Sequence, residues 1–219
     1  MEMLFGDWKN RESHKGKLFI TDGVIDKELW DKSKNKVLFL LKEAYDSKRV
    51  EGSWDLPTLI RREKVSGRTF KPMAQWVYGI HGLMENKEII PFQEDGADVK
   101  LALLSSSIIN LKKSSGAKKS SSKNLARYVE EDWDLISEQI AIIQPKIVIC
   151  GNTWSLIRTK ISHHKISDRA YLSEGVLYID YWHPANRASN KMNYYALCAL
   201  VQLAINKLEN NSIKIATEL

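Results

Sequence analysis

The chain has 219 residues, of which 43% are hydrophobic and 27% charged, so it is long enough for one domain with a sizeable core. Its formal net charge of +6, from 33 Lys and Arg residues against 27 Asp and Glu residues, favours a polyanionic partner. Two cysteines are too few for a metal cluster, and no apolar run is long enough to cross a bilayer. Because the first residues lack the pattern of a secretory signal, we expect a cytoplasmic protein that acts as a monomer, without a membrane or a metal.

The first half of the sequence predicts two core strands separated by a helix. Residues 1–35 are mixed and charged, which indicates an N-terminal arm with a short helix. Residues 36–41 have the near-continuous apolarity of a parallel strand that is covered on both faces. A long irregular stretch follows, and then a helical pattern around residues 73–80. A second strand is expected at residues 101–104 or slightly later, reaching Ile109.

The second half alternates between helices and strands. Residues 112–124 combine Lys, Ser and Gly without a large apolar side chain, so they predict a flexible basic loop. After it we expect a helix at residues 128–143, a strand at 146–150 and a second helix from about residue 154. A strand at residues 176–181 and a closing helix at 194–208 complete the pattern. The alternation predicts the α/β class, as a single domain over residues 1–219. The expected architecture is a three-layer α/β/α sandwich around a central, mainly parallel, four-stranded sheet.

Polar side chains follow each predicted strand. Glu43 and Asp46 follow the first strand, Asn110 ends the second, and Asn152 and His183 follow the third and fourth. Ligands of open α/β sheets bind at the carboxyl ends of the strands, so these positions are candidates for one site. Each residue also has an ordinary interpretation as a solvent-facing carboxylate, the end of a strand or a cap of a turn, and for Asn152 the cap is preferred.

Five motifs in this order resemble the uracil-DNA glycosylase superfamily, over a stretch from about Lys36 to Leu208. Individually they are weakly specific, but their order and approximate spacing together are a stronger signal. They are Lys42-Glu43-Ala44-Tyr45-Asp46, similar to Gly-Glu-Ala-Pro-Gly; Gly67-Arg68-Thr69-Phe70, similar to Gly-Arg-Pro-Phe; Ile109-Asn110-Leu111-Lys112, similar to Asn-Val-Val-Lys; the helix, Pro-Lys turn and strand that end at Gly151; and His183-Pro184-Ala185, which matches His-Pro-Ser/Ala.

The sequence departs from the family pattern in its first motif. Lys42 replaces a glycine, Tyr45 stands where proline is usual, and Asp46 falls where the uracil-specific branch has a tyrosine that blocks the thymine methyl group. This departure suggests a pocket that accepts an enlarged pyrimidine. The cysteine ligands of the iron-sulfur branch are absent from the sequence, so no cluster and no other cofactor is expected.

The resemblance implies a role for each site residue. Cleavage of a glycosidic bond leaves a cation-like sugar and an anionic base, so it requires negative charge beside the sugar and a hydrogen-bond donor beside the base. The catalytic residues would be Glu43 or Asp46 for the first task and His183 for the second. The expected substrate-binding residues are Phe70, Asn110 and Tyr45. Phe70 would stack on the base, and Asn110 would form hydrogen bonds with its edge.

The expected partner is DNA. Arg187 would probe the minor groove, and Lys191, Lys112 and Lys113 would contact phosphates. The implied activity is that of a monofunctional DNA glycosylase, which leaves an abasic site after removing uracil or a modified pyrimidine. The family includes enzymes that act on hypermodified cytosines of phage DNA, such as glucosylated hydroxymethylcytosine, as antiviral defence, and this chain is a candidate for that role.

Two other functions stay open at this point. The first is a non-catalytic nucleic-acid-binding protein that retains the glycosylase fold. The second is an unrelated α/β hydrolase of a small phosphorylated molecule, although the sequence has neither a Gly-x-Ser-x-Gly motif nor a Walker-type loop.

Overall fold

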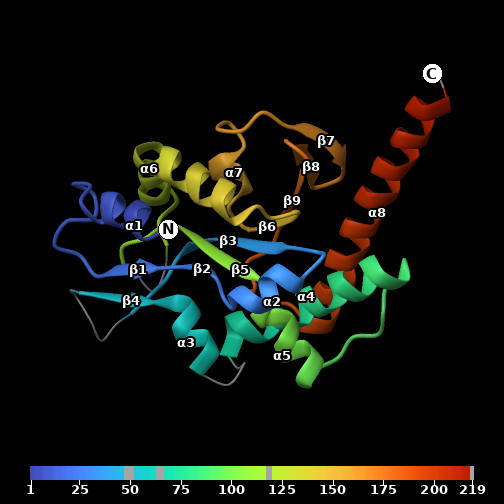
Figure 1. The fold of residues 1–219 in the computed structure, drawn as a ribbon, viewed down its shortest axis with the longest axis horizontal. Helices are drawn as coiled ribbons and strands as arrows, with labels where there is room; N and C mark the ends of the chain where they lie inside the picture. The colour runs from blue at the N-terminus through green and yellow to red at the C-terminus, as the bar shows by residue number, and fades with distance from the viewer. Residues whose placement is uncertain (47–51, 63–66, 117–119, 218–219) are drawn as a thin grey trace.

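A central mixed sheet organises the protein. The computed structural model describes residues 1–46, 52–62, 67–116 and 120–217. Its described residues form a seven-stranded sheet in the order β2-β5-β3-β6-β9-β8-β7 and a separate pair, β1-β4 (Figure 1). The strands are β1 (Phe19–Thr21), β2 (Gly23–Val24), β3 (Val37–Glu43), β4 (Ser53–Asp55), β5 (Ser107–Lys112), β6 (Ile147–Gly151), β7 (His164–Ser167), β8 (Ala170–Ser173) and β9 (Val176–Tyr181).

The four inner strands, β5, β3, β6 and β9, run parallel to one another. Strand β2 pairs antiparallel with β5 at one edge, and the β7–β8 hairpin extends the other edge antiparallel to β9. The α/β class is therefore confirmed, whereas the expected four-stranded sheet is too small. The additional strands have two to four residues each and lack a continuous apolar run, so periodicity gives little indication of them.

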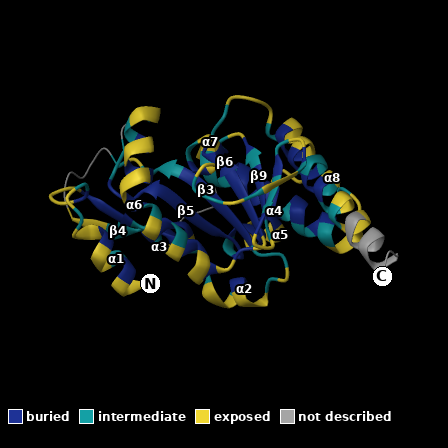
Figure 2. Cartoon of the chain, turned by 90° about the horizontal axis from the view of Figure 1, so that it is seen from above, coloured by how far each residue is buried: buried dark blue, intermediate teal, exposed yellow. Residues whose placement is uncertain are grey.

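Helices cover both faces of the sheet. They are α1 (Glu2–Lys9), α2 (Lys27–Lys32), α3 (Leu56–Arg62), α4 (Gly67–Asn86), α5 (Ala97–Leu104), α6 (Ser122–Ile143), α7 (Trp154–Ile157) and α8 (Asn190–Thr217). Alternate residues of β3 point to opposite faces, so Phe39 belongs to the core cluster that includes residues of α4, α5 and α8, and Leu40 belongs to the cluster that includes residues of α1, α6 and α7. Figure 2 shows the result as buried strands between helices whose outer faces are exposed.

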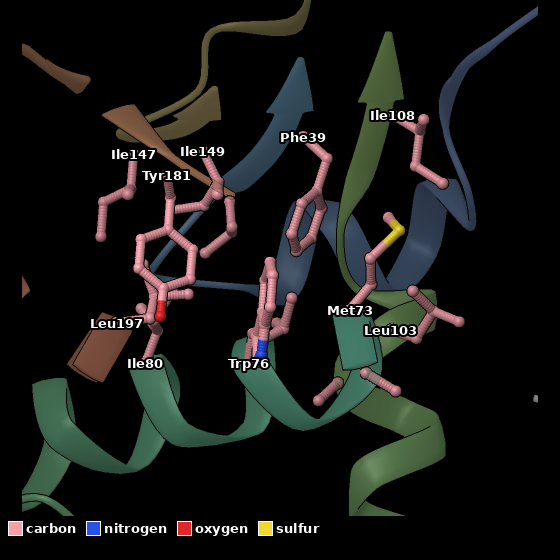
Figure 3. Packing of buried hydrophobic residues seen from close by; sticks show 14 of the residues in the cluster. Phe39, Met73, Trp76, Ile80, Leu103, Ile108, Ile147, Ile149, Tyr181 and Leu197 are labelled. Carbon is pink, nitrogen blue, oxygen red and sulfur yellow. The ribbon is translucent and has the colours of Figure 1, made fainter. Parts of the chain in front are cut away.

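An aromatic contact fixes α4 against the sheet. The fully buried Trp76 lies between Phe39 of β3 and Tyr181 of β9, with ring centroids 6.4 Å and 5.2 Å away (Figure 3). The second contact is edge-to-face, a favoured geometry for aromatic pairs. Because Phe70 lies in the same helix, this packing also sets the position of the first turn of α4 beside the strand ends.

The N-terminal residues belong to the packed body. Trp8 of α1 is fully buried, as is Ile25 after β2, and Trp30 of α2 is 3% exposed. Strand β1 pairs with β4, and β2 pairs with β5. The expected arm at residues 1–35 is thus a set of short elements that complete one edge and one face of the protein.

The second strand lies at the later of its two expected positions, and one expected loop differs in the structure. Residues 101–104 lie in helix α5, and the strand is β5, which begins at Ser107 and contains Ile109; a short apolar run does not distinguish a buried helix from a strand. Within the expected loop at residues 112–124, Lys112 ends β5, Lys113 and Ser114 are buried, and α6 begins at Ser122. Residues 117–119 of that loop lie outside the described residues.

Within the described residues, no helix combines the length and apolarity that a membrane span requires. The same part of the chain contains no group of three or more His, Cys, Asp and Glu side chains placed to hold a metal ion.

Candidate active site at the strand ends

The chain leaves neighbouring strands in opposite directions at the carboxyl edge of the sheet. After β3 it continues into α3 and α4 on one face, whereas after β5 and β6 it continues into α6 and α7 on the other face. In open α/β sheets such a reversal leaves a crevice beyond the strand ends, where ligands bind. The topology therefore predicts a site beside the end of β3.

A pocket of about 670 Å³ occupies this place. It is lined by Glu43 at the end of β3, Asn110 of β5, Phe70 of α4 and His183 after β9, and by Tyr45 beyond β3. Five of the six residues that the sequence suggested for catalysis and substrate binding thus meet around one cavity. The sixth, Asp46, is not among its described lining residues; its backbone N–H donates to Ser115 Oγ at 3.3 Å.

Another hollow, of about 610 Å³, lies at the amino-terminal edge of the sheet, where Pro145 precedes β6 and Gly175 precedes β9. Its size is similar, but it is at the edge where open α/β sheets do not usually bind ligands. We therefore treat the pocket at the carboxyl edge as the candidate active site.

Glu43 brings a carboxylate to the pocket through a buried ion pair. Lys112 Nζ lies 2.8 Å from Glu43 Oε2, and the two side chains are only 10% and 4% exposed. The parallel register places these residues opposite each other. Gly116 packs directly over the carboxyl group, since a Cβ at this position would lie 2.2 Å from Glu43 Cδ. The carboxylate is therefore held in place from two sides.

Asn110 is 4% exposed and is fixed by Asp22. Its backbone N–H and its Nδ2 both donate to Asp22 Oδ2, at 2.8 and 3.2 Å. Asp22 Oδ1 in turn receives Lys113 Nζ, at 2.5 Å. Burial lowers the pKa of the Lys113 ammonium group, and the charge of Asp22 acts against this shift.

His183 presents a neutral imidazole. The backbone N–H of Ala185 donates to His183 Nδ1 at 3.1 Å, so the ring proton of the neutral form lies on Nε2. Burial, followed by the charge of Lys42, lowers the pKa of His183 to about 4. Gly151 leaves room for the side chain of Leu41, because a Cβ there would be 2.6 Å from Leu41 Cδ2, whereas His183 Cα would lie at an ordinary contact distance of 3.6 Å. At neutral pH the ring is therefore a hydrogen-bond donor without charge.

Aromatic and aliphatic side chains form the rest of the wall. Phe70 is half-buried in the first turn of α4, Trp54 comes from β4, and Tyr45 is 51% exposed at the rim. Leu56 and Leu59 of α3 add apolar surface. Such a wall suits a flat or partly apolar ligand, with the polar groups of Glu43, Asn110 and His183 to orient it.

The two lysines after Asn110 do not lie where phosphate contacts would require them. Lys113 is fully buried against Asp22, and Lys112 is paired with Glu43. Their placement therefore does not support the expectation that they bind DNA, since both ammonium groups are buried and paired with carboxylates. The sequence gives runs of lysine next to serine and glycine, which resemble a surface loop, and shows no sign of the carboxylates that pair with them.

A basic groove adjoins the pocket. It measures about 550 Å³ and is lined by Arg68 and Lys71 of α4 and by Arg187 and Asn186 of the loop after His183. Lys71 is paired with Glu94 at 3.0 Å, whereas Arg68 and Arg187 are exposed. Arg187 was expected beside DNA; Lys191 is also exposed but does not line the groove.

Three features of the site were not predicted from the sequence. They are the contact of Asp22 with Asn110, the apolar lining contributed by α3, and the effect of Lys42 on the pKa of His183. Asp22 stands in a short Thr-Asp-Gly turn with no periodic pattern around it, so only the fold reveals that it contacts Asn110. Leu56 and Leu59 resemble ordinary core residues. Lys42 was visible as a departure from the family motif, but its effect on His183 depends on the distance between two strand ends.

The charge of Lys42 and the burial of His183 can be tested together by NMR titration of the imidazole. We expect a pKa of about 4 for His183, compared with an ordinary value of 6.5, and a higher pKa in the Lys42→Met variant, because one of the two causes is removed. Between pH 6.5 and 4 the unfolded chain would bind a proton that the folded chain does not, so stability should fall as the pH falls through this range.

The matched control is Lys160→Met, because Lys160 pairs with Glu130 on α6 and does not line this pocket. This change should leave the pKa of His183 where it is. A wild-type His183 that titrates near 6.5, or a Lys42→Met variant with an unchanged pKa, would contradict the electrostatic description of the site.

Comparison with known proteins adds no family name to this geometry. A scan against protein-family models finds no match, and a search of curated proteins finds no significant relative.

Proposed function

We propose that the protein is a monofunctional DNA glycosylase that hydrolyses the N-glycosidic bond of a flipped-out uracil or modified pyrimidine. The observation that carries this proposal is that Glu43, Asn110 and His183 line one pocket together with Phe70. These residues are far apart in the sequence, and their groups match the needs of the reaction one by one. The glycosylase-like identity of the three-layer fold is part of the same proposal.

Each group has a place in the reaction. Phe70 stacks on the extruded base, and Asn110 bonds its edge. When the bond from C1′ to the base nitrogen breaks, its electron pair leaves with the base, and the Nε2–H of His183 donates to the base oxygen on which charge accumulates. A water oxygen then bonds to C1′ and gives its proton to Glu43, which has stabilised the cation-like sugar and oriented this water. Glu43 releases this proton to solvent, and the base anion takes up a proton from solvent. The products are the free base and an abasic site.

A neutral histidine suits this role. A charged imidazolium would already be a strong donor to the bound base, whereas the low pKa of His183 keeps the ring uncharged at neutral pH. Its hydrogen bond then strengthens as negative charge develops on the base, which favours the transition state over the bound substrate.

The surroundings of the pocket support DNA as the substrate. The groove that contains Arg68 and Arg187 is next to the cavity and offers positive charge for a phosphate backbone. The volume of the cavity, about 670 Å³, supports acceptance of an enlarged pyrimidine, including glucosylated hydroxymethylcytosine of phage DNA. An antiviral role in the cytoplasm, as a monomer, belongs to the same proposal.

One observation favours the alternative, a non-catalytic nucleic-acid-binding protein. The Glu43 carboxylate is paired with Lys112, so part of the negative charge that the sugar cation needs is neutralised. An excision assay separates the two functions, because a binder retains DNA affinity and releases no base.

We expect strand scission by alkali after incubation of the protein with DNA that carries at least one of uracil, 5-hydroxymethylcytosine or its glucosylated form; DNA that carries hypoxanthine, a purine, is the fourth substrate and tests the restriction to pyrimidines. Glu43→Gln should lower the excision rate roughly 10²- to 10⁴-fold, the range of a lost acid–base or charge-stabilising group, with little change in DNA affinity. Because the change leaves Lys112 without its partner, thermal unfolding should be compared in Glu43→Gln and in Glu43→Gln/Lys112→Met.

Glu130→Gln is the control for the loss of a lysine-paired carboxylate outside the pocket, since Glu130 pairs with Lys160 on the exposed surface of α6. It should cleave like the wild type. The Asp46→Asn variant identifies the carboxylate that handles water: with Glu43 in this role, Asp46→Asn retains most of the activity. If all four DNAs stay intact with the wild-type protein, the binder replaces the glycosylase.

DNA affinity should depend on the basic groove. Arg68→Ala and Arg187→Ala should each weaken binding to DNA of any sequence, and each should reduce the slope of log affinity against log salt by about 1, because one phosphate contact is lost. Fluorescence anisotropy at several salt concentrations measures both effects. Lys100→Ala on α5, an exposed lysine outside the groove, is the control, and equal slopes for all variants would argue against DNA along this groove.

A further inference from the structure

Asp22 fills a break in the pairing along the edge of β5. On one side of the break, Gly23 of β2 pairs with Ile108; on the other, the backbone N–H of Ile20 donates to the carbonyl oxygen of Lys113 at 2.8 Å. Between them the backbone N–H of Asn110 donates to the carboxylate of Asp22. The side chain of Asp22 thus takes the place of a neighbouring strand at Asn110, which lines the pocket.

The same carboxylate fixes the side chain of Asn110. Asp22 Oδ2 accepts from Asn110 Nδ2 at 3.2 Å in addition to the backbone N–H at 2.8 Å. Asp22 Oδ1 accepts from Lys113 Nζ at 2.5 Å and from Gln139 Nε2 at 3.1 Å. The side chains of Asp22 and Lys113 are fully buried, and Gln139 is fully buried as well. With donors on both oxygens, the carboxylate cannot turn away from Asn110 without leaving a buried charge unpaired.

A fixed amide can distinguish two pyrimidines that a freely turning amide would accept alike. Uracil offers an acceptor at C4 and a donor at N3, and cytosine offers a donor at C4 and an acceptor at N3. An asparagine amide, which carries one acceptor and one donor group, fits either edge after a half-turn about its last bond. Because Asn110 Nδ2 is held by Asp22, this half-turn would bring Asn110 Oδ1 against the carboxylate, where two acceptors repel each other.

We infer that Asp22 is the positioning residue that sets which pyrimidine edge the pocket accepts, by holding the amide of Asn110 in one orientation. The inference rests on the proposed function, since it takes the ligand of the pocket to be a nucleobase. Lys113 and Gln139 support this role by holding Asp22.

The test compares two double variants that share the removal of the buried ammonium group. Asp22→Ala/Lys113→Met removes the acceptor, so the amide of Asn110 can turn. Asp22→Asn/Lys113→Met keeps an oxygen that can accept from both N–H groups of Asn110. Its new NH₂ group can donate to Gln139 Oε1, a buried atom with no partner among the described residues, if the Gln139 amide turns and gives up the hydrogen bond that its Nε2 donates to the backbone carbonyl oxygen of Asp22. Both variants lose the ion pair, and they differ in whether residue 22 has an oxygen that accepts from the amide of Asn110.

The readout is the affinity of the intact protein for free uracil and free cytosine, measured by NMR titration. We expect the wild type and Asp22→Asn/Lys113→Met to bind one base roughly tenfold or more tightly than the other, as a bidentate base contact provides. In Asp22→Ala/Lys113→Met the two affinities should lie within about threefold of each other, because the weaker base gains affinity. If Asp22 had only a structural role, its loss would lower the affinity for uracil and for cytosine by the same factor.

Tyr194→Phe is the control for stability. It removes the hydrogen bond that the Tyr194 hydroxyl donates to the carbonyl oxygen of Ile90 at 2.8 Å, outside the described lining of the pocket. It should lower the unfolding temperature and leave the ratio of the two affinities unchanged. An alanine double variant that keeps the wild-type ratio would overturn the inference alone, and a wild type that binds neither base would overturn the proposed function with it.

A measurement on the wild type covers the case in which the alanine variant does not fold. The side-chain amide protons of Asn110 should exchange with solvent far more slowly than those of the exposed Asn152, because Asn110 Nδ2 is buried and bonded to Asp22. Equal exchange rates for the two side chains would show that the amide of Asn110 is not held, and the inference would fail.

Discussion

The parallel pairing of β3 with β5 is the constraint on which the site depends. Its register places Leu41 opposite Asn110 and Glu43 opposite Lys112, so an amide, a carboxylate and an ammonium group emerge at one edge of the sheet. The pairing of β3 with β6, and of β6 with β9, brings His183 to the same edge. A shift of one residue in this register would turn each side chain to the opposite face and disperse the site.

Buried charge follows from this arrangement. Polar groups at the ends of apolar strands lie partly inside the protein, where an unpaired charge is costly, so each carboxylate is matched by a lysine. Lys112 pairs with Glu43 and Lys113 with Asp22. Two consecutive residues thus serve the two faces of the strand end, one at the proposed catalytic carboxylate and one at the residue that holds Asn110. This explains why a segment that resembles a surface loop is buried.

The parts of the fold that depend on local pattern could be predicted from the sequence. The apolar runs before Glu43 and His183 gave the inner strands, and the rule that parallel strands place their carboxyl ends together brought Glu43, Asn110 and His183 to one pocket. Phe70 was found through the motif that contains it. These predictions needed the order of the elements and no detail of their packing.

The parts that depend on contacts between distant residues could not be predicted. Asp22 is 88 residues from Asn110, and its role appears only when β2 lies along β5. Lys113 follows Lys112 in a polar run, and its burial depends on the same edge. The short strands β7 and β8 form through pairing with β9, and their own residues carry little signal.

The central claim is that the groups at the strand ends surround a nucleobase. The most direct measurement is a crystal structure of the protein with abasic DNA and a free pyrimidine base. Our account places the base against Phe70, with its edge on Asn110 and an oxygen near His183 Nε2, and the sugar beside Glu43. A base found elsewhere, or DNA bound on a face away from the groove of Arg68 and Arg187, would contradict it.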